Sequence, residues 1–358
     1  MVKNALLMSV PYRITFLLTC LFGLIGCDPF AKPETMMDEY VKRLGHVLDV
    51  EPKYSDLIYI ERIPRPRERK LSIPETEINM LDFLALYGCE LQFVVGEKNS
   101  IMGRVMQPLN NLRYELRFIE AARVCLAEID NDNLRQKVSE AIETKQQSLP
   151  LIIWNATWGT DEIARLMSLS NGLYQPEQSQ HEISTYSNDI NYLNSVVRKL
   201  QAGDYADDLN YVGDIQQRWQ YGSRAGQLHN SVRLLASRLD DATQILKQRI
   251  HQKPLCPQGQ PNNKAKTVES VFFNVYIANV QPYLSSVNRG AEQLFKPLAE
   301  LADIQQHVMP DSFRPYYDQS LRWDNDKGLW SKDQQQVKAH TEAWQDLLEQ
   351  CGLRPTPD

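Results

Sequence analysis

The sequence predicts an all-α protein, an elongated helical bundle that contains a long antiparallel helical hairpin at about residues 206–250 and 268–305. A first apolar run alternates steps of four and three residues: Tyr221, Ala225, Leu228, Val232, Leu235, Leu239, Ala242 and Leu246. A second run has the same period: Phe273, Ile277, Val280, Leu284, Val287, Ala291, Leu294, Leu298 and Leu301. The segment between them, 251–266, is rich in Pro, Gln and Asn and predicts a loop. Each arm would be about 45 Å long at ~1.5 Å per residue.

Apolar residues in the rest of the chain also recur with a helical period. They predict helices near 37–48, 80–94, 105–119, 132–148, 160–169, 187–201 and 331–352, with Ser187 and Ser331 as N-caps. Residues 51–76 break this pattern with Pro52, Pro64, Pro66 and Pro74. This segment therefore predicts an extended connector with at most a short strand at about Leu57 to Ile60.

Residues 1–26 have the features of a signal peptide. Lys3 and Arg13 precede an apolar run at 14–24, which is too short to span a bilayer, since a spanning helix needs roughly 20 apolar residues. The run ends in Leu-Ile-Gly-Cys, which resembles the lipobox of bacterial lipoproteins. We therefore expect cleavage before Cys27 and acylation of this cysteine, which would anchor the protein to a membrane on its periplasmic side. Asp28 resembles the signal that retains lipoproteins in the inner membrane, which favours that membrane over the outer one.

These features divide the chain into three parts. Residues 1–26 are the expected signal peptide, and residues 27–76 are a lipidated N-terminus with a short helix and the Pro- and Arg-containing connector. Residues 77–358 form the helical body, with a sub-division near 175–185.

Charge and composition exclude some classes of function. The chain has a net charge of −6, and removal of residues 1–26 takes away Lys3 and Arg13 and no acid, so the mature charge is −8. An acidic exported protein is a poor nucleic-acid binder. The 42% of hydrophobic residues argues against a disordered chain.

Four cysteines remain in the body after Cys27, and in an oxidising compartment they predict two disulfide bonds. The helix at 331–352 can return toward the loop between the hairpin arms, which favours the pair Cys256–Cys351. Cys89 and Cys125 then pair by elimination, provided that the turn between their helices lies near residue 107. With a turn at Asn99 instead, that bridge would require another helix to bend. No CxxC or zinc-ligand spacing occurs among these cysteines.

Residues 81–125 contain a pattern formed by Cys89, the run Glu97-Lys98-Asn99-Ser100, Gly103, the pair Tyr114-Glu115, and Cys125. With this pattern the segment resembles the N-terminal core of a family of uncharacterised proteobacterial lipoproteins. The resemblance implies an envelope lipoprotein over the whole mature chain, and it supplies no catalytic residues because the family has no assigned activity.

One polar cluster between residues 97 and 117 is the candidate ligand site. Its candidate residues are Glu97, Asn99, Arg104, Arg113 and Glu115, which could line a pocket that recognises an anion or an amide. The alternative, which we favour, is that these groups end helices, form turns and pair between helices. Ser100 has no GxSxG context, which argues against a serine hydrolase.

Other polar and aromatic features have a structural interpretation. The six histidines are scattered and do not predict a metal site. The basic run at 61–70, ERIPRPRERK, could lie on anionic lipid headgroups, but a solvated linker is favoured. Trp154 and Trp158 lie one helical turn apart and could stack a ligand ring, but core packing is favoured.

These features favour a non-catalytic binding or scaffold protein of the bacterial envelope, without cofactors, whose partner is another envelope protein. One alternative is a periplasmic enzyme or small-ligand binder that uses the cluster at 97–117. Another is a cell-wall-binding module.

Overall fold

A computed structural model describes residues 32–74, 86–100 and 103–354, apart from the side chains of Asn99, Arg104 and residues 177–180. The predicted all-α class is confirmed, and these ranges contain no strand. The short strand expected at 57–60 is absent because the chain there bonds to helix side chains instead of to another strand. None of the described helices has the length and apolar character that a membrane crossing requires.

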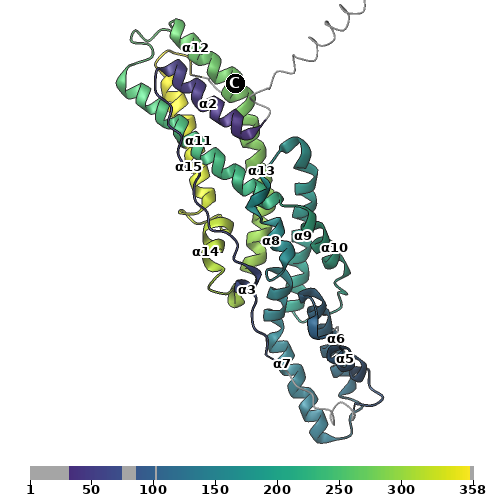
Figure 1. Cartoon of the computed structure of the whole chain (residues 1–358). Coiled ribbons are helices and arrows are strands. Elements are labelled where there is room, and N and C mark those ends of the chain that lie inside the picture. Colours follow the sequence, from purple (N-terminus) through teal and green to yellow (C-terminus); the bar gives the residue numbers. More distant parts are fainter. Residues whose placement is uncertain (1–31, 75–85, 101–102, 355–358) are drawn as a thin grey trace, which may run out of the picture.

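The helices form a long, narrow body (Figure 1). At one end lie α2 (Pro33–Leu48), α11 (Arg224–Gln252), α12 (Asn263–Val271) and α15 (Leu329–Glu349). At the other end lie α5 (Glu90–Asn99), α6 (Pro108–Cys125) and the first turns of α7 (Asp132–Thr157). Between them lie α8 (Asp161–Leu166), α9 (Pro176–Gln201), α10 (Asn210–Tyr221) and α13 (Gln281–Asp303). The short elements are α3 (Pro66–Arg69), α14 (Arg314–Tyr316), η1 (Gly103–Val105), η2 (Leu169–Asn171), η3 (Phe272–Val280), η4 (Gln306–Val308) and η5 (Tyr317–Leu321).

The first arm of the expected hairpin is two helices. Gly222 is extended (φ −124°, ψ 143°) and separates α10 from α11, and a Cβ there would overlap the hydroxyl of Tyr186. As a result, Tyr221, the expected start of the seam, is 85% exposed. Helix α10 packs against α8, whereas α11 contacts α2, α13 and α15.

The second arm contains a π-helix, η3, between α12 and α13. A π-helix has more residues per turn than an α-helix, so it shifts which residues face the core. Phe272 and Tyr276 are therefore buried in place of the expected Phe273 and Ile277, which are exposed. Tyr276 stacks on Tyr40 of α2, with ring centroids 5.6 Å apart.

Several expected helix boundaries are also wrong. Within the described residues, the helix expected near 80–94 begins only at Glu90 and ends at Asn99. Helix α7 continues beyond residue 148 through Pro150 to Thr157. Helix α9 begins at Pro176, so Ser187 lies inside it and donates to the carbonyl oxygen of Gln293 across the bundle. Helix α15 begins at Leu329, two residues before Ser331.

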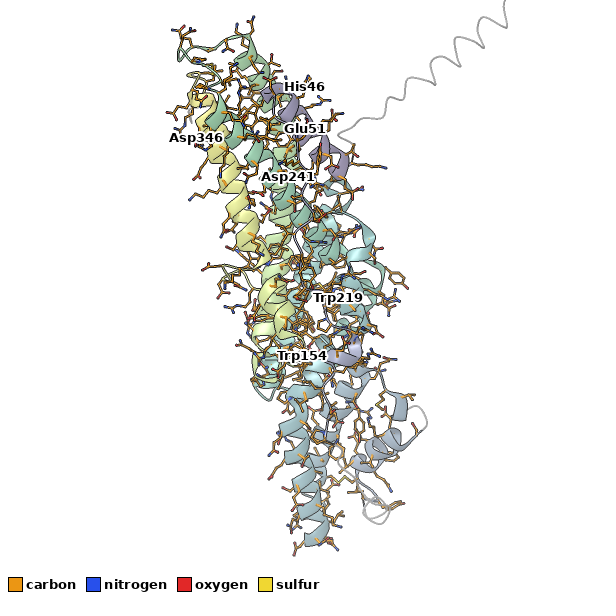
Figure 2. All side chains as sticks on the ribbon, turned by 60° about the vertical axis from the view of Figure 1, so that its left-hand side comes forward. His46, Glu51, Trp154, Trp219, Asp241 and Asp346 are labelled. Atoms are coloured by element: carbon orange, nitrogen blue, oxygen red, sulfur yellow. A yellow bond between two sulfur atoms is a disulfide. The ribbon has the colours of Figure 1, made fainter. Side chains whose placement is uncertain are left out.

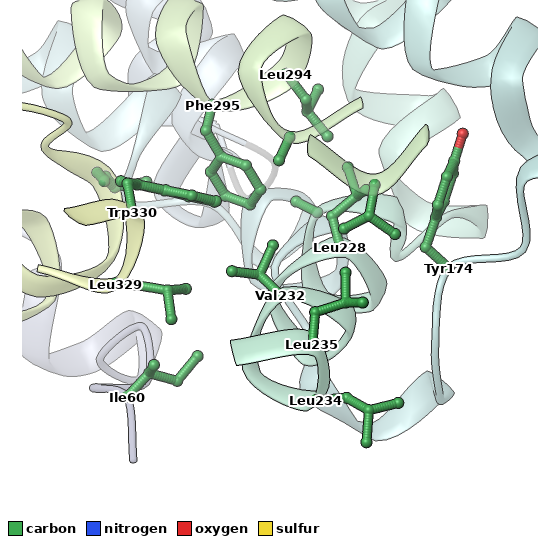
Figure 3. Packing of buried hydrophobic residues seen from close by; sticks show 14 of the residues in the cluster. Ile60, Tyr174, Leu228, Val232, Leu234, Leu235, Leu294, Phe295, Leu329 and Trp330 are labelled. Carbon is green, nitrogen blue, oxygen red and sulfur yellow. The ribbon is translucent and has the colours of Figure 1, made fainter. Parts of the chain in front are cut away.

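Two hydrophobic clusters stabilise the body. The larger one runs from α2 through the middle of the bundle to α15. It buries Trp154 and Trp158, as the core interpretation of this pair predicts, and Figure 2 labels Trp154 and Trp219 in the middle part of the body. Phe295 and Trp330 pack side by side in it, with ring centroids 4.8 Å apart (Figure 3). The smaller cluster lies between α5, α6 and the start of α7. We call residues 86–142 the distal module.

The connector after α2 is bound to the body along its length (Figure 1). The backbone N–H of Ser55 donates to the carboxylate of Asp241, and that of Ile58 donates to the hydroxyl of Ser237. The prediction of a solvated linker is wrong for Arg69, which is fully buried. Its guanidinium donates to the carbonyl oxygens of Pro64, Trp158 and Thr160, because the junction of α7 and α8 leaves carbonyls that need donors.

Two disulfide bonds join the predicted pairs of cysteines. Cys89 and Cys125 link the start of α5 to the end of α6, and Cys256 and Cys351 link the loop after α11 to the end of α15. The first bond closes the distal module, and the second closes the end of the body that holds α2. Cys27 and Asp28 lie outside the described residues.

Candidate functional site

A hollow of about 540 Å³ opens on the distal module between the end of α5, η1 and the start of α6. It coincides with the cluster expected at 97–117. Its described lining residues are Glu97, Ser100, Gly103, Val105, Met106, Gln107, Asn110, Arg113, Tyr114 and Arg117. The side chains of Asn99 and Arg104 are outside the described part of the chain.

Local sequence explains how the hollow forms. Ser100 ends α5, and its hydroxyl donates to the carbonyl oxygen of Glu97 (2.7 Å) and accepts from the backbone N–H of Gly103 (3.0 Å). A Cβ at Gly103 would overlap the carbonyl oxygens of Glu97 and Lys98, so only glycine allows this tight return of the chain. Pro108 then begins α6 at the first helical position, where its missing N–H does no harm.

The charged residues of the hollow differ in their freedom to bind a ligand. Arg117 and Glu97 form an exposed 2.8 Å ion pair, which contributes little to stability and can exchange for other partners. Arg113 instead donates to the carbonyl oxygens of Leu209 (2.8 Å) and Asp208 (3.3 Å) ahead of α10. Arg113 therefore fastens the distal module to the rest of the body.

Glu115 does not line the hollow. It lies on the buried side of α6 and forms a 2.5 Å ion pair with Lys145 of α7. The Lys145 ammonium also lies 4.6 Å from the ring centroid of Phe118 and 5.3 Å from that of Tyr114. This pair holds α6 against α7. Lys145 could not be identified from the sequence as the partner, because nothing local indicates which residue thirty positions away will face Glu115.

One exposed apolar side chain, Val105, lines the hollow, and two more continue its face along α5 and α6. Phe93 lies one turn before Glu97 on α5 and is 75% exposed, and Val105 in η1 is 70% exposed. Val124 lies seven residues after Arg117 on the same face of α6 and is 67% exposed. We call this surface the distal face, and it comprises Phe93, Glu97, Val105, Arg113, Arg117 and Val124. Helical periodicity could not reveal it, because the periodic pattern identifies only the residues that turn inward.

Ser100 is the serine that the sequence offered as a nucleophile, and it lines the hollow. The Ser100 hydroxyl is bonded to backbone, as described above. Within residues 32–74, 86–100 and 103–354, no three His, Cys, Asp or Glu side chains gather in a group that could hold a metal ion. The distal face presents exposed apolar side chains beside the Arg117–Glu97 ion pair, whose two charges can exchange partners. Such a surface can bind another molecule.

Residues 37–355 match the model of a family described as a protein of unknown function (DUF3080). The match includes both disulfide bonds, the distal face and the body behind it. No curated protein and no solved structure matches the chain.

Proposed function

The chain belongs to the DUF3080 family, and since the family description carries no activity, we propose from the geometry that the protein is a lipid-anchored, non-catalytic envelope protein. In this proposal Cys27 carries the acyl chains, and the distal face binds another protein of the envelope. The inner membrane, through Asp28, is the membrane that we favour.

The positions of the two ends of the body support this arrangement. Helix α2 lies toward one end and the α5–α6 pair lies at the other (Figure 1). Only Asp28 to Lys32 separate Cys27 from α2, and five residues span at most about 18 Å. An anchor at Cys27 would therefore hold the α2 end close to the membrane and leave the distal face well away from it.

The composition of the distal face is the observation that carries the binding role. Three large apolar side chains are at least two-thirds exposed there, beside Arg113 and Arg117. Isolated exposed apolar residues are common, but a group of them with arginines around a hollow is typical of a protein–protein interface. The disulfide bond fixes α5 to α6, and the ion pair of Glu115 with Lys145 fixes α6 to α7 behind the face. Both contacts lower the entropy that the face would lose on binding.

Crosslinking in cells tests the partner. A photo-crosslinking amino acid at Phe93 or Val124 should capture one and the same protein. Tyr221 is the matched control, because it is an equally exposed aromatic residue on α10, outside the distal face. Absence of adducts from both distal positions, or the same adducts from Tyr221, would contradict the docking role.

Acyl labelling tests the anchor separately. Cys27→Ala should abolish incorporation of a labelled fatty acid and should leave the unprocessed precursor. Cys20→Ala is the control, because this cysteine lies inside the apolar run and should not affect labelling. Normal labelling and maturation of Cys27→Ala would refute the lipoprotein assignment while leaving the docking face to be judged by crosslinking.

The hollow itself favours a second candidate function, binding of a small ligand at the cluster 97–117. Arg117→Gln is the appropriate test, because Arg113 and Glu115 hold helices in place and their loss would disturb the fold. If Arg117→Gln fails to complement a strain that lacks the protein but keeps the partner crosslink at Phe93, the small ligand is favoured. Loss of function in Phe93→Ser alone would favour the protein partner.

A further inference from the structure

A second hollow, of about 270 Å³, lies in the middle of the body where four segments meet. The connector contributes Glu61, Arg62 and Ile63, and the end of α8 with η2 contributes residues 167–170. Helix α11 contributes His229, and α14 contributes Tyr316. The distal face plays no part in this hollow, so ligand binding here would be independent of the proposed docking role.

The floor of the hollow presents a hydrogen-bond donor and an acceptor. Tyr316 is 2% exposed, and its hydroxyl has no hydrogen-bond partner among the described residues. The Nε2 of His229 lies 3.1 Å from the carbonyl oxygen of Ser320, and because a carbonyl only accepts, Nε2 must carry the proton. Nδ1 is then an acceptor, and it too has no partner in the described part of the chain.

The two floor residues are held in place by packing. The rings of His229, Phe295 and Trp330 form a three-way cluster, in which His229 lies 4.1 Å from Phe295 and 5.6 Å from Trp330 between ring centroids. Tyr316 meets His229 edge-on, with centroids 6.5 Å apart. Burial lowers the pKa of His229 to about 4 and raises that of Tyr316, so at neutral pH the imidazole is uncharged and the phenol keeps its proton. An unpartnered buried hydroxyl is destabilising unless something in the hollow bonds to it.

The hollow is lined by one acid, Glu61, and one base, Arg62, and the nearby Arg233 makes the charge around it positive by one. Arg62 lines it, and the positive charge of Arg62 contributes to a lowered pKa of Arg233, after burial as the main cause. Arg233 donates to the carbonyl oxygen of Ile58 and to the amide oxygen of Asn230, and it also lowers the pKa of His229. Neither arginine forms an ion pair with a described acidic residue. Glu61 accepts from the hydroxyl of Tyr59 at 3.3 Å.

We propose that this hollow binds a small organic anion that carries a hydroxyl group. The anionic group would meet Arg62 and the field of Arg233. The ligand hydroxyl would accept from the O–H of Tyr316 and donate to Nδ1 of His229, which neither a bare anion nor a neutral ether could do. The volume corresponds to roughly nine water molecules at ~30 Å³ each, so the ligand has about that many non-hydrogen atoms.

Calorimetric titration of the full chain in detergent tests this site. The probes are lactate, glycerate and glycerol 3-phosphate, which separate carboxylate from phosphate ligands. Propionate lacks the hydroxyl and glycerol lacks the charge, so each should bind at least ~10-fold more weakly than the best probe. Failure of all three probes to bind at millimolar concentration would overturn the proposal, as would equal binding of lactate and propionate; the hollow would then hold water only.

Single substitutions test whether Tyr316 and Arg62 bind the ligand. Tyr316→Phe keeps the ring and should weaken binding by roughly 2- to 10-fold, and Arg62→Gln should weaken it by ~10-fold or more. Arg67→Gln is the matched control, because Arg67 lies on the same connector, is exposed and does not line the hollow. Tyr316→Phe and Arg62→Gln are judged by affinity in chains whose melting temperature matches that of the control. Affinities equal to that of Arg67→Gln in both would place the ligand elsewhere and overturn the proposal.

Discussion

The indole nitrogen of Trp154 donates a 2.8 Å hydrogen bond to the carbonyl oxygen of Arg69, and the guanidinium of Arg69 donates in turn to the carbonyl oxygen of Trp158. Two residues further along the connector, at Leu71, a second pair of hydrogen bonds joins it to α7. The side-chain amide of Asn155 accepts from the backbone N–H of Leu71 and donates to its carbonyl oxygen, both at 2.8 Å. The backbone of the connector is therefore hydrogen-bonded at every second residue, as in a β-ladder, but its partners here are side chains of α7.

Arg69→Met should lower the free energy of unfolding by about 3 kcal/mol. The methionine fills much of the space but leaves the carbonyl oxygens of Pro64, Trp158 and Thr160 without donors, and each unsatisfied buried acceptor is destabilising. Urea denaturation measures the change. Arg67→Met, on the exposed side of the same short helix, should change stability by less than about 0.5 kcal/mol, and equal effects of the two variants would show that the Arg69 contacts do not matter.

Stability should fall as the pH is lowered below about 6.5. His340 is buried between Tyr40, Thr243 and Trp344, and burial lowers its pKa to about 3. The hydroxyl of Thr243 donates to the carbonyl of Leu239, so Nδ1 of His340 donates to Thr243 and Nε2 accepts from Tyr40. The unfolded chain takes up a proton near the ordinary pKa of 6.5, whereas the folded chain does not until about pH 3. The stability that the neutral, buried His340 contributes is fully present above pH 6.5, the pKa of the unfolded chain. It is lost as the pH falls from 6.5 toward 3, the pKa in the folded chain.

At pH 5 this effect should remove about 2 kcal/mol per buried histidine, and His229 with a pKa of about 4 contributes in the same direction. Melting temperatures between pH 7.5 and 4.5 measure the slope. His340→Gln should flatten it, whereas His46→Gln should not, because His46 is exposed. An unchanged slope in His340→Gln would mean that this imidazole titrates at the same pH in the folded and the unfolded chain, which would contradict the lowered pKa.

Asp333→Asn should stabilise the protein at alkaline pH. The carboxyl is buried in the first turns of α15, one of its oxygens has no hydrogen-bond partner, and burial raises its pKa to about 7. For a raised carboxyl pKa, the stabilisation is complete below the unfolded value of 3.8 and is lost as the pH rises through 7. Unfolding measured at pH 5 and pH 8.5 should show a gain of about 2 kcal/mol at the higher pH relative to the lower one. A gain of the same size at both pH values would contradict the titration.

Replacing Cys89 and Cys125 by serine should loosen the distal module and leave the main core intact. The bond closes a loop of 36 residues, for which chain entropy gives about 4 kcal/mol, and the small cluster behind it has few apolar residues to compensate. Hydrogen exchange should speed up over 86–142 and stay slow over α11 and α13. The double serine variant at Cys256 and Cys351 is the control, and it should loosen the opposite end of the body instead.

Helical periodicity predicted much of this fold because most of the core is made of helix faces. It predicted helices at the positions of α6, α11 and α13. The even number of cysteines, together with the expected directions of the helices, predicted both disulfide bonds. It missed the phase shift at η3 and the break at Gly222, since each depends on a contact across the bundle: Tyr276 with Tyr40, and Gly222 with Tyr186. The local pattern carries no information about those partners.

The sites were harder to predict than the fold. The cluster at 97–117 was visible because its residues are close in sequence. Arg69 was hidden in a run of charges that resembles a solvated linker, and only the distant carbonyls of Trp158 and Thr160 make it a buried residue. The central hollow combines the connector with α8, α11 and α14, so no sequence window contains it.

The bound connector also determines how the body would respond to force. The contacts of Ser55, Ile58 and Arg69 are spread along the length of the connector. A pull between an anchored α2 and a partner held at the distal face would act roughly along the connector, so these hydrogen bonds would share the load and would have to break together. Such an arrangement resists shear far better than it resists peeling from one end, so with the anchor and partner that we propose the body would transmit tension between them.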